Sequence, residues 1–175
     1  KNVAQKRAIA QAAARLVGPQ DFVYLDAGSS VDLLVDCLDE MRATYATDSV
    51  SHALKLASRG FEVIVLGGSL KSATQAVVGP DTNSAIARYH FTLGFWGANG
   101  ITCEDGFTTP DAAEAEVKRL SMRQTLHRFV LADASKADRV SRVTFADFED
   151  ATLVTSALPA GSALLGCENV MVVDA

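Results

Sequence analysis

A short corner of the sequence has the residue types needed to bind an anion. The stretch LDAGSS places Asp26, Gly28, Ser29 and Ser30 between an apolar run and an amphipathic segment. A helix that begins at such a corner exposes free backbone N–H groups and the positive end of its dipole. Glycine allows a ligand to approach closely and serine hydroxyls add donors, so a phosphate or carboxylate fits there. Serine also caps helices routinely, and the corner alone leaves both interpretations open.

Polar or glycine-rich residues also follow four other segments that read as strands. They are Asp48 with Ser49, Gly67 and Gly68 before Lys71, Asn99 and Gly100 in the GANG turn, and Lys136 in LADASK. Ligands of open parallel sheets bind outside the carboxyl ends of the strands, so we expect these residues along one rim. Lys136 would then supply a point charge for a phosphate, although an ordinary surface lysine is the simpler interpretation.

The sequence gives weaker support for a functional role of the other polar and charged residues. Glu114 and Lys118 stand four residues apart in a helical pattern, which is typical of a surface ion pair worth about 0.3–0.5 kcal/mol. Asp26 could bind a sugar hydroxyl or hold the backbone of its own turn. The three histidines are scattered, form no Ser/His/Asp set and are interpreted as structural or surface residues. Paired metal ligands and a GxGxxG fingerprint are both missing, so we predict no metal, no cofactor and no catalytic residue.

The elements that must position these residues follow from hydrophobic periodicity. Helices are predicted over 6–17, 31–38, 50–57, 81–89 and 111–127, and strands over 22–25, 44–47, 61–66, 91–96, 129–132, 153–155 and 170–173. Apolar strands that alternate with helices indicate an α/β protein with a mainly parallel sheet and helices on both faces. We find no linker or repeat, and expect a single domain over residues 1–175, with Phe91, Phe95 and Trp96 in its core.

Composition narrows the function classes. The chain has 175 residues, a net charge of −5 and 49% hydrophobic residues. An acidic chain of this kind is poorly suited to contact a nucleic-acid backbone itself. No apolar run reaches membrane-spanning length, no secretory leader is seen, and three unpaired cysteines fit a reducing, cytoplasmic location. The chain opens inside a helical pattern without Met, so we expect it to be part of a longer protein.

Taken in order, the motifs resemble a known family. LDAGSS, TDS, LGGSLK, GANGI, GFTTPDAAEAEVKR and LADASK resemble the sugar-sensing C-terminal domain of DeoR-type transcriptional regulators. The likeness runs from KNVAQKRAIAQAA to the LVTS strand. In this domain the family is similar to pentose-phosphate isomerases and glucosamine-phosphate deaminases. The resemblance therefore implies a Rossmann-like sheet that binds a phosphorylated sugar, a homo-oligomer, and DNA binding only through a winged helix-turn-helix domain upstream of this chain.

The resemblance also implies which residues contact the ligand. Matched position by position, they are Asp26, Gly28, Ser29, Ser30, Asp48, Gly67, Gly68, Asn99, Gly100, Glu114 and Lys136. Two positions depart from the usual family pattern. Ser29 and Ser30 stand where threonines are usual, which keeps the hydroxyls. Asp48 stands where asparagine is usual, which adds a negative charge near the expected anion site.

A sensor and an enzyme remain the two alternatives. Isomerases of this fold have acidic residues in a GADE-like turn where this chain has GANG. Proton transfer between sugar carbons needs a carboxylate near the substrate, and Asn99 cannot act as that base, although Glu114 could. We therefore predict a domain that senses a sugar phosphate and controls DNA binding by linkage. The alternative is a sugar-phosphate isomerase or deaminase.

Overall fold

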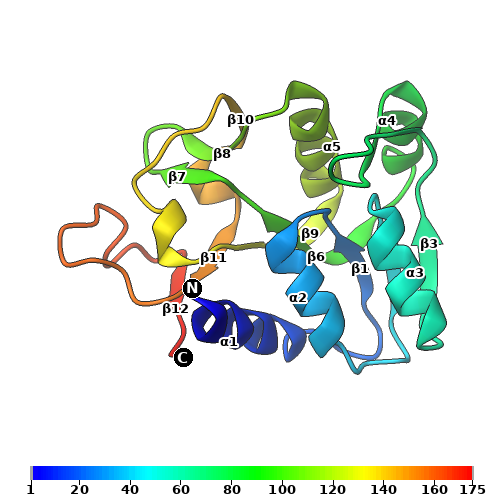
Figure 1. Ribbon diagram of the computed structural model, residues 1–175, viewed down its shortest axis with the longest axis horizontal. Coiled ribbons are helices and arrows are strands. Elements are labelled where there is room, and N and C mark those ends of the chain that lie inside the picture. Colours follow the sequence, from blue (N-terminus) through cyan, green and yellow to red (C-terminus); the bar gives the residue numbers. More distant parts are fainter. Residues whose placement is uncertain (1, 175) are drawn as a thin grey trace.

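Short runs of β-branched and aromatic residues form seven strands of one parallel sheet in the computed structural model, which describes residues 2–174 (Figure 1). The strands are β1 (Phe22–Leu25), β2 (Thr44–Thr47), β3 (Glu62–Val65), β6 (Phe91–Gly97), β9 (Thr125–Leu131), β11 (Thr152–Thr155) and β12 (Val170–Val172). Their order is β12-β11-β9-β6-β1-β2-β3, and all the pairs are parallel. The prediction of a mainly parallel sheet is confirmed.

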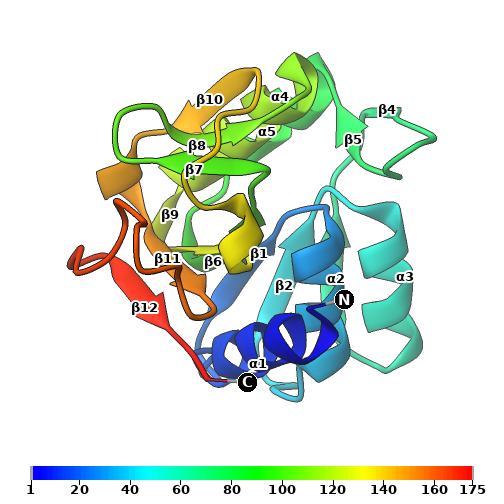
Figure 2. The same ribbon diagram turned by 60° about the vertical axis from the view of Figure 1, so that its left-hand side comes forward.

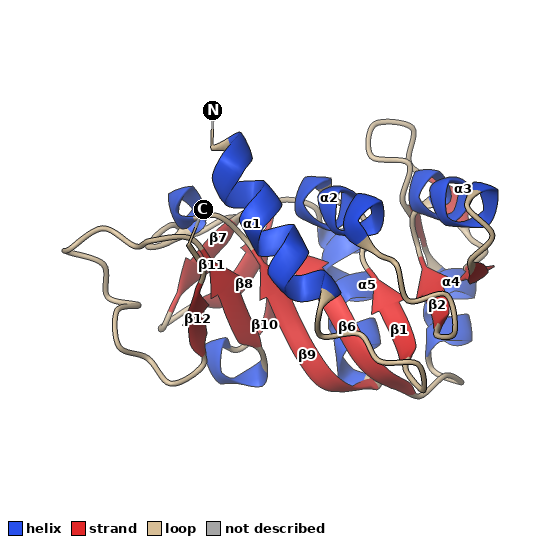
Figure 3. Cartoon of the chain, turned by 90° about the horizontal axis from the view of Figure 1, so that it is seen from below, coloured by secondary structure: helices blue, strands red, loops and turns tan. Residues whose placement is uncertain are grey.

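Helices cover both faces of this sheet, as predicted (Figure 3). One face carries α1 (Val3–Ala14), α2 (Ser29–Cys37) and α3 (Val50–Ser58), and the other carries α4 (Pro80–Ile86) and α5 (Ala112–Arg123). Phe95 packs in the core under the first group, whereas Phe91 and Trp96 pack in the core under the second. Within residues 2–174 no helix is long and apolar enough to cross a membrane.

Two small antiparallel units were not predicted. The strands β7 (Gly100–Thr102), β8 (Gly106–Thr109) and β10 (Val143–Ala146) form a three-stranded sheet in the order β10-β8-β7. A hairpin of β4 (Ser69–Leu70) and β5 (Val77–Val78) projects from the edge of the molecule (Figure 2). These strands have only two to four residues each. Such short runs leave too little periodicity to separate them from loops.

The predicted helix over 111–127 is wrong at its C-terminal end. α5 ends at Arg123, and β9 already begins at Thr125. The run TLHRFVL is rich in β-branched and aromatic residues, and it pairs with β6 through Phe91↔Thr125 and Leu93↔His127. Sheet pairing with β6 therefore overrides the helical pattern that continues into these residues.

The chain reverses its direction of travel across the sheet between β1 and β6. From β1 the chain moves to β2 and β3 on one side, then returns to β6 on the other side. The adjacent carboxyl ends of β1 and β6 form the crevice in which open α/β sheets bind ligands. Asp26 lies at this point, where its backbone N–H donates to the Phe95 carbonyl oxygen over 3.0 Å.

Candidate ligand-binding site

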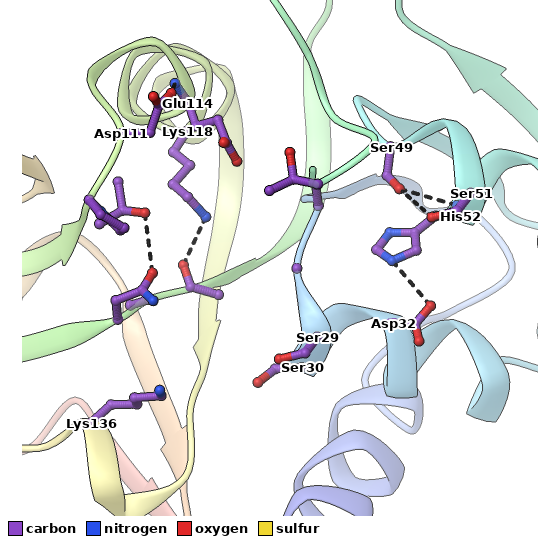
Figure 4. A pocket seen from close by; sticks show the side chains of 18 of the residues that line it. Ser29, Ser30, Asp32, Ser49, Ser51, His52, Asp111, Glu114, Lys118 and Lys136 are labelled. Carbon is purple, nitrogen blue, oxygen red and sulfur yellow. Dashed lines mark hydrogen bonds and ion pairs between the residues drawn. The ribbon is translucent and has the colours of Figure 1, made fainter. Parts of the chain in front are cut away.

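A pocket of about 660 Å³ opens at the carboxyl ends of the strands beside β1 and β6 (Figure 4). Its walls are the segments that follow β1, β2, β6, β8 and β9, together with the N-terminal parts of α3 and α5, one residue of α1 and one residue of the β4–β5 hairpin. The volume lies in the range that binds small organic ligands. Most of the lining side chains are polar or charged, so the pocket suits a hydrophilic ligand.

The N-terminus of α2 faces this pocket without a side-chain cap. Gly28 is the N-cap residue, with φ 133° and ψ 164°, and no side-chain cap hydrogen bond forms there among residues 2–174. A side chain at such a positive φ is strained, so glycine is required by the backbone. Ser29 and Ser30 line the pocket and do not cap the helix. The N–H groups of the first turn are therefore available to an anion.

Lys136 reaches the pocket from the opposite side (Figure 4). It ends the short 3-10 helix η1 (Ala134–Lys136), whose first residues are held by Asp133 Oδ1 accepting from Ser135 N over 2.9 Å. Lys6 of α1 also lines the pocket, with its Nζ 4.0 Å from Asp133 Oδ2. Within residues 2–174 no carboxylate forms a salt bridge with the Lys136 ammonium. Lys136 therefore supplies a positive charge that faces the α2 N-terminus and is not held in a salt bridge with any carboxylate of residues 2–174.

Residues at the start of α3 form another wall. Ser49 caps α3 by accepting from His52 N over 3.2 Å, and its hydroxyl lies 3.1 Å from that of Ser51. His52 Nε2 faces Asp32 Oδ1 at 3.4 Å, and Lys55 Nζ donates to the same oxygen over 2.8 Å. Burial lowers the pKa of His52, which favours the neutral imidazole at pH 7. His52 was predicted to be structural or a surface residue; it is buried and it also lines the pocket.

The first turn of α5 forms the wall opposite α3. Asp111 is the N-cap residue of α5, accepting from Glu114 N over 2.8 Å, and it also accepts from Lys71 Nζ over 3.0 Å. Burial, and then the charge of Asp111, raise the pKa of Glu114. Asn99 Oδ1 accepts from Thr109 Oγ1 over 3.3 Å, which leaves the Asn99 amide donors for a ligand. This wall therefore presents hydrogen-bonding groups suited to hydroxyls.

A buried ion pair supports the pocket floor. Lys118 Nζ donates to Asp26 Oδ2 and, over 3.0 Å, to the Gly97 carbonyl oxygen, while Gly97 N donates to Asp26 Oδ2 over 3.1 Å. Lys118 is 6% exposed and Asp26 is 2% exposed. The predicted surface pair of Glu114 and Lys118 is therefore wrong. Lys118 pairs with Asp26 and clamps the end of β1 to the end of β6.

A second carboxyl group is buried next to this pair. Asp48 is 3% exposed, and its Oδ1 accepts from the Tyr24 hydroxyl over 3.0 Å. Burial, and then the neighbouring charge of Asp26, raise the pKa of Asp48 to about 8. Asp48 is therefore mostly protonated at neutral pH, and the negative charge expected from its departure from the family pattern is largely absent.

We expect Asp48→Asn to stabilise the chain and to flatten its stability profile above pH 4. The folded state keeps the Asp48 proton up to about pH 8, whereas the unfolded chain loses it near pH 4. In that window the folded state binds more protons, so the free energy of unfolding of the parent falls as pH rises. Asparagine keeps an acceptor for Tyr24 and has no charge to bury. The expected gain at pH 8 is roughly 1–3 kcal/mol.

Urea unfolding of parent and variant between pH 4 and 8 measures this effect. Asp39→Asn, which changes an exposed carboxylate, is the matched control and is expected to follow the parent. A parent whose stability does not decline between pH 5 and 8 relative to the variant would contradict the raised pKa.

The structure brings some of the predicted ligand residues into the pocket and leaves others outside. Those that line it are Gly28, Ser29, Ser30, Asn99, Glu114 and Lys136. Asp26 and Asp48 lie buried beneath the floor, and Gly100 is buried in β7. Gly67 and Gly68 follow the edge strand β3 and pack against Thr82 of α4, whose hydroxyl donates to the Gly67 carbonyl oxygen over 2.5 Å. The pocket adds Lys6, His52 and Lys118, which were not predicted as ligand residues.

Comparison with known families places this pocket in context. A family model described as the DeoR C-terminal sensor domain matches residues 1–157. The chain belongs to the DeoR C-terminal sensor domain family. The match includes α1 through β11, and therefore every wall of the pocket. The resemblance noted in the motifs is confirmed.

Similar curated proteins of this DeoR-type group are transcriptional regulators. The chain is 38% identical to the HTH-type transcriptional regulator FruR of Bacillus subtilis, covering 89% of this chain and 62% of that protein. It is 30% identical to a putative aga operon transcriptional repressor of Escherichia coli O157:H7, covering 92% of this chain and 61% of that protein. It is 28% identical to a lactose phosphotransferase system repressor of Streptococcus mutans, covering 83% of this chain and 59% of that protein. The DeoR-type sensor chain thus spans about 60% of the length of these relatives.

Solved structures with similar folds include enzymes and translation factors. Ribose 5-phosphate isomerase A of Methanocaldococcus jannaschii superposes with a TM-score of 0.57 at 15% identity, covering 78% of this chain and 55% of that chain. The eIF2B delta subunit of Chaetomium thermophilum gives a TM-score of 0.55 at 14% identity, covering 83% of this chain and 57% of that chain. At this identity the likeness establishes the α/β fold of the DeoR-type sensor domain and says nothing about its ligand.

Proposed function

We propose that this chain is the effector-binding domain of a DeoR-type transcriptional repressor and that the effector is a phosphorylated sugar. One observation carries the proposal: the uncapped N-terminus of α2 and the Lys136 ammonium line the same pocket. Backbone N–H groups and a lysine point charge together suit a phosphate monoester. Lys6 adds a second cation on the same side.

The remaining walls suit the hydroxyl groups of a sugar. The lining also includes short polar side chains, namely Ser49, Ser51, Thr74, Asn99 and Thr109. The carboxylates of Asp32 and Glu114 add acceptors for hydroxyl donors. The name of the Streptococcus mutans relative, which refers to the lactose phosphotransferase system, supports a sugar-derived effector for this chain as well.

Control of DNA binding would follow from linkage. The relatives are named HTH-type regulators, and we propose that a DNA-binding domain of this type precedes α1 in the whole protein. Lys6 lies on α1 and in the pocket, so an effector contacts the helix nearest to that domain. An effector that binds two arrangements with different affinity shifts DNA binding by no more than that difference, typically about 1–3 kcal/mol. We propose that the repressor acts in the cytoplasm as a homo-oligomer.

A thermal-shift screen of pentose and hexose monophosphates, each beside its unphosphorylated sugar, tests the proposal. A ligand at about 100 times its Kd stabilises the folded state by about 2.7 kcal/mol, which raises Tm by roughly 5–10 °C. We expect at least one phosphorylated sugar to give such a shift and its unphosphorylated partner to give none. Equal increases in Tm from the phosphorylated and unphosphorylated members of every pair would contradict a phosphate-binding site.

The same samples distinguish a sensor from an isomerase. After incubation, a ¹H NMR spectrum of each stabilising sugar phosphate is expected to show the starting compound alone. Conversion to an isomeric sugar phosphate that depends on the chain would favour the enzyme alternative, with Glu114 as the first base to replace.

A further inference from the structure

Two cysteines that are distant in the sequence lie close together outside the ligand pocket. Cys103 follows β7 in the turn toward β8, and Cys167 lies in the connection between β11 and β12. Their Sγ atoms lie 4.0 Å and 3.8 Å from the same atom, the carbonyl oxygen of Ala163. Both side chains are half-buried, so small reagents can reach them.

The connection that carries Cys167 is anchored against β7. Leu164 is fully buried and belongs to the core cluster that also contains Ile101 of β7 and Leu153 of β11, which fixes the middle of the connection. Ala163 N donates to Asp138 Oδ1 over 3.2 Å, and Asp138 N donates to the Ile101 carbonyl oxygen over 2.8 Å. In Figure 1 the connection, drawn in orange, lies on the same side of the molecule as β7. The proximity of the two thiols is therefore a property of the packed fold.

We propose that Cys103 and Cys167 are a modification site. Small-molecule disulfides oxidise the two thiols by exchange, and a reversible disulfide bond forms between Cys103 and Cys167. One thiolate attacks the reagent disulfide, forms a mixed disulfide and displaces one reagent thiolate. The second cysteine thiolate then attacks the protein sulfur of the mixed disulfide and displaces the other. One S–S bond forms and one breaks, and the two cysteine protons end on the two released thiols.

The surroundings of the pair set the conditions for exchange. Burial, the adjacent Cys167 thiol and the nearby Glu104 and Asp138 carboxylates raise the pKa of the Cys103 thiol. The Cys103 thiolate is therefore scarce at neutral pH, and the nearby carboxylates disfavour an anionic reagent. Bis(2-hydroxyethyl) disulfide, which is neutral, at about pH 8.5 is the appropriate probe.

Intact mass spectrometry of a Cys37→Ser chain tests the proposal, because Cys37 lies in the core cluster on the other face of the sheet. We expect the treated chain to lose the mass of two hydrogens and to carry no reagent adduct. A peptide digest is expected to contain Cys103 joined to Cys167, and dithiothreitol is expected to restore the original mass. The cross-linked chain should melt roughly 5–10 °C above the reduced chain, because the bond closes a long loop.

A second variant makes the result decisive. In Cys37→Ser/Cys103→Ser no second thiol can resolve the mixed disulfide, so Cys167 is expected to retain one reagent adduct. Two stable adducts on the Cys37→Ser chain, or unmodified thiols after prolonged exposure, would overturn the proposal.

Discussion

Replacing Lys118 by methionine is expected to destabilise the chain by about 3–5 kcal/mol, since it leaves the Asp26 carboxylate buried without its cation. Asp26 is 2% exposed, and among residues 2–174 the donor that remains to its carboxylate is Gly97 N at 3.1 Å. For a chain of this size the loss corresponds to a fall in Tm of roughly 6–20 °C. Because the pair joins β1 to β6, the pocket floor should loosen together with the fold.

Two variants separate the buried pair from general effects of losing a positive charge. Arg119 is the next residue of α5 and pairs on the surface with Glu116 over 2.6 Å, so Arg119→Met is expected to cost less than 1 kcal/mol. Asp26→Asn added to Lys118→Met removes both charges and keeps an acceptor for Gly97 N. The double variant should therefore be more stable than Lys118→Met alone. Urea unfolding measures all three, and a Lys118→Met variant as stable as Arg119→Met would contradict the structure.

Replacing Lys136 by alanine is expected to weaken binding of the sugar phosphate found in the screen by roughly 10–100-fold. The lysine lies in the pocket, and no salt bridge within residues 2–174 occupies its ammonium group. A hydrogen bond to a charged group is worth about 1.5–3 kcal/mol, and each 1.4 kcal/mol changes Kd about tenfold. The fold should be unaffected, because the side chain is not part of the core.

Isothermal titration calorimetry measures this loss at two salt concentrations. Arg88→Ala removes one exposed positive charge at the end of α4, outside the pocket, and serves as the matched control. The control should bind the phosphate as the parent does, and the difference for Lys136→Ala should shrink at high salt. If both variants lose affinity equally, the effect comes from net charge and the assignment of Lys136 fails.

The large-scale architecture was readable from the sequence because it depends on local patterns. Each strand of the parallel sheet is a short run of β-branched or aromatic residues, and the glycines and polar residues that follow mark the strand ends. Five of the expected ligand residues meet in one pocket for this reason: Gly28, Ser29, Ser30, Asn99 and Lys136. Glu114, which the family resemblance added, lines the same pocket from α5. From sequence alone, the LDAGSS corner could be either a serine helix cap or an anion-binding site. The structure places Gly28 at the N-cap, so neither serine caps the helix.

The buried polar contacts could not be predicted from the sequence, because they depend on which strands are neighbours and on how each helix is rotated about its axis. Lys118 looked like the partner of Glu114, because spacing along a helix is visible in sequence and packing across the sheet is not. Asp26 and Lys118 meet only because β6 lies beside β1 and α5 turns this face toward them. The burial of Asp48 beside Tyr24 likewise depends on the pairing of β1 with β2.

We propose above all that a phosphate group binds between the α2 N-terminus and Lys136. An ¹H–¹⁵N NMR titration of the chain with the stabilising sugar phosphate tests it most directly, because each backbone amide reports on its own surroundings. We expect the largest shifts at the amides of Gly28, Ser29 and Ser30, and we expect Lys136→Ala to need higher ligand concentrations to produce them. Saturating shifts elsewhere, with these three amides unmoved, would contradict the proposed phosphate seat.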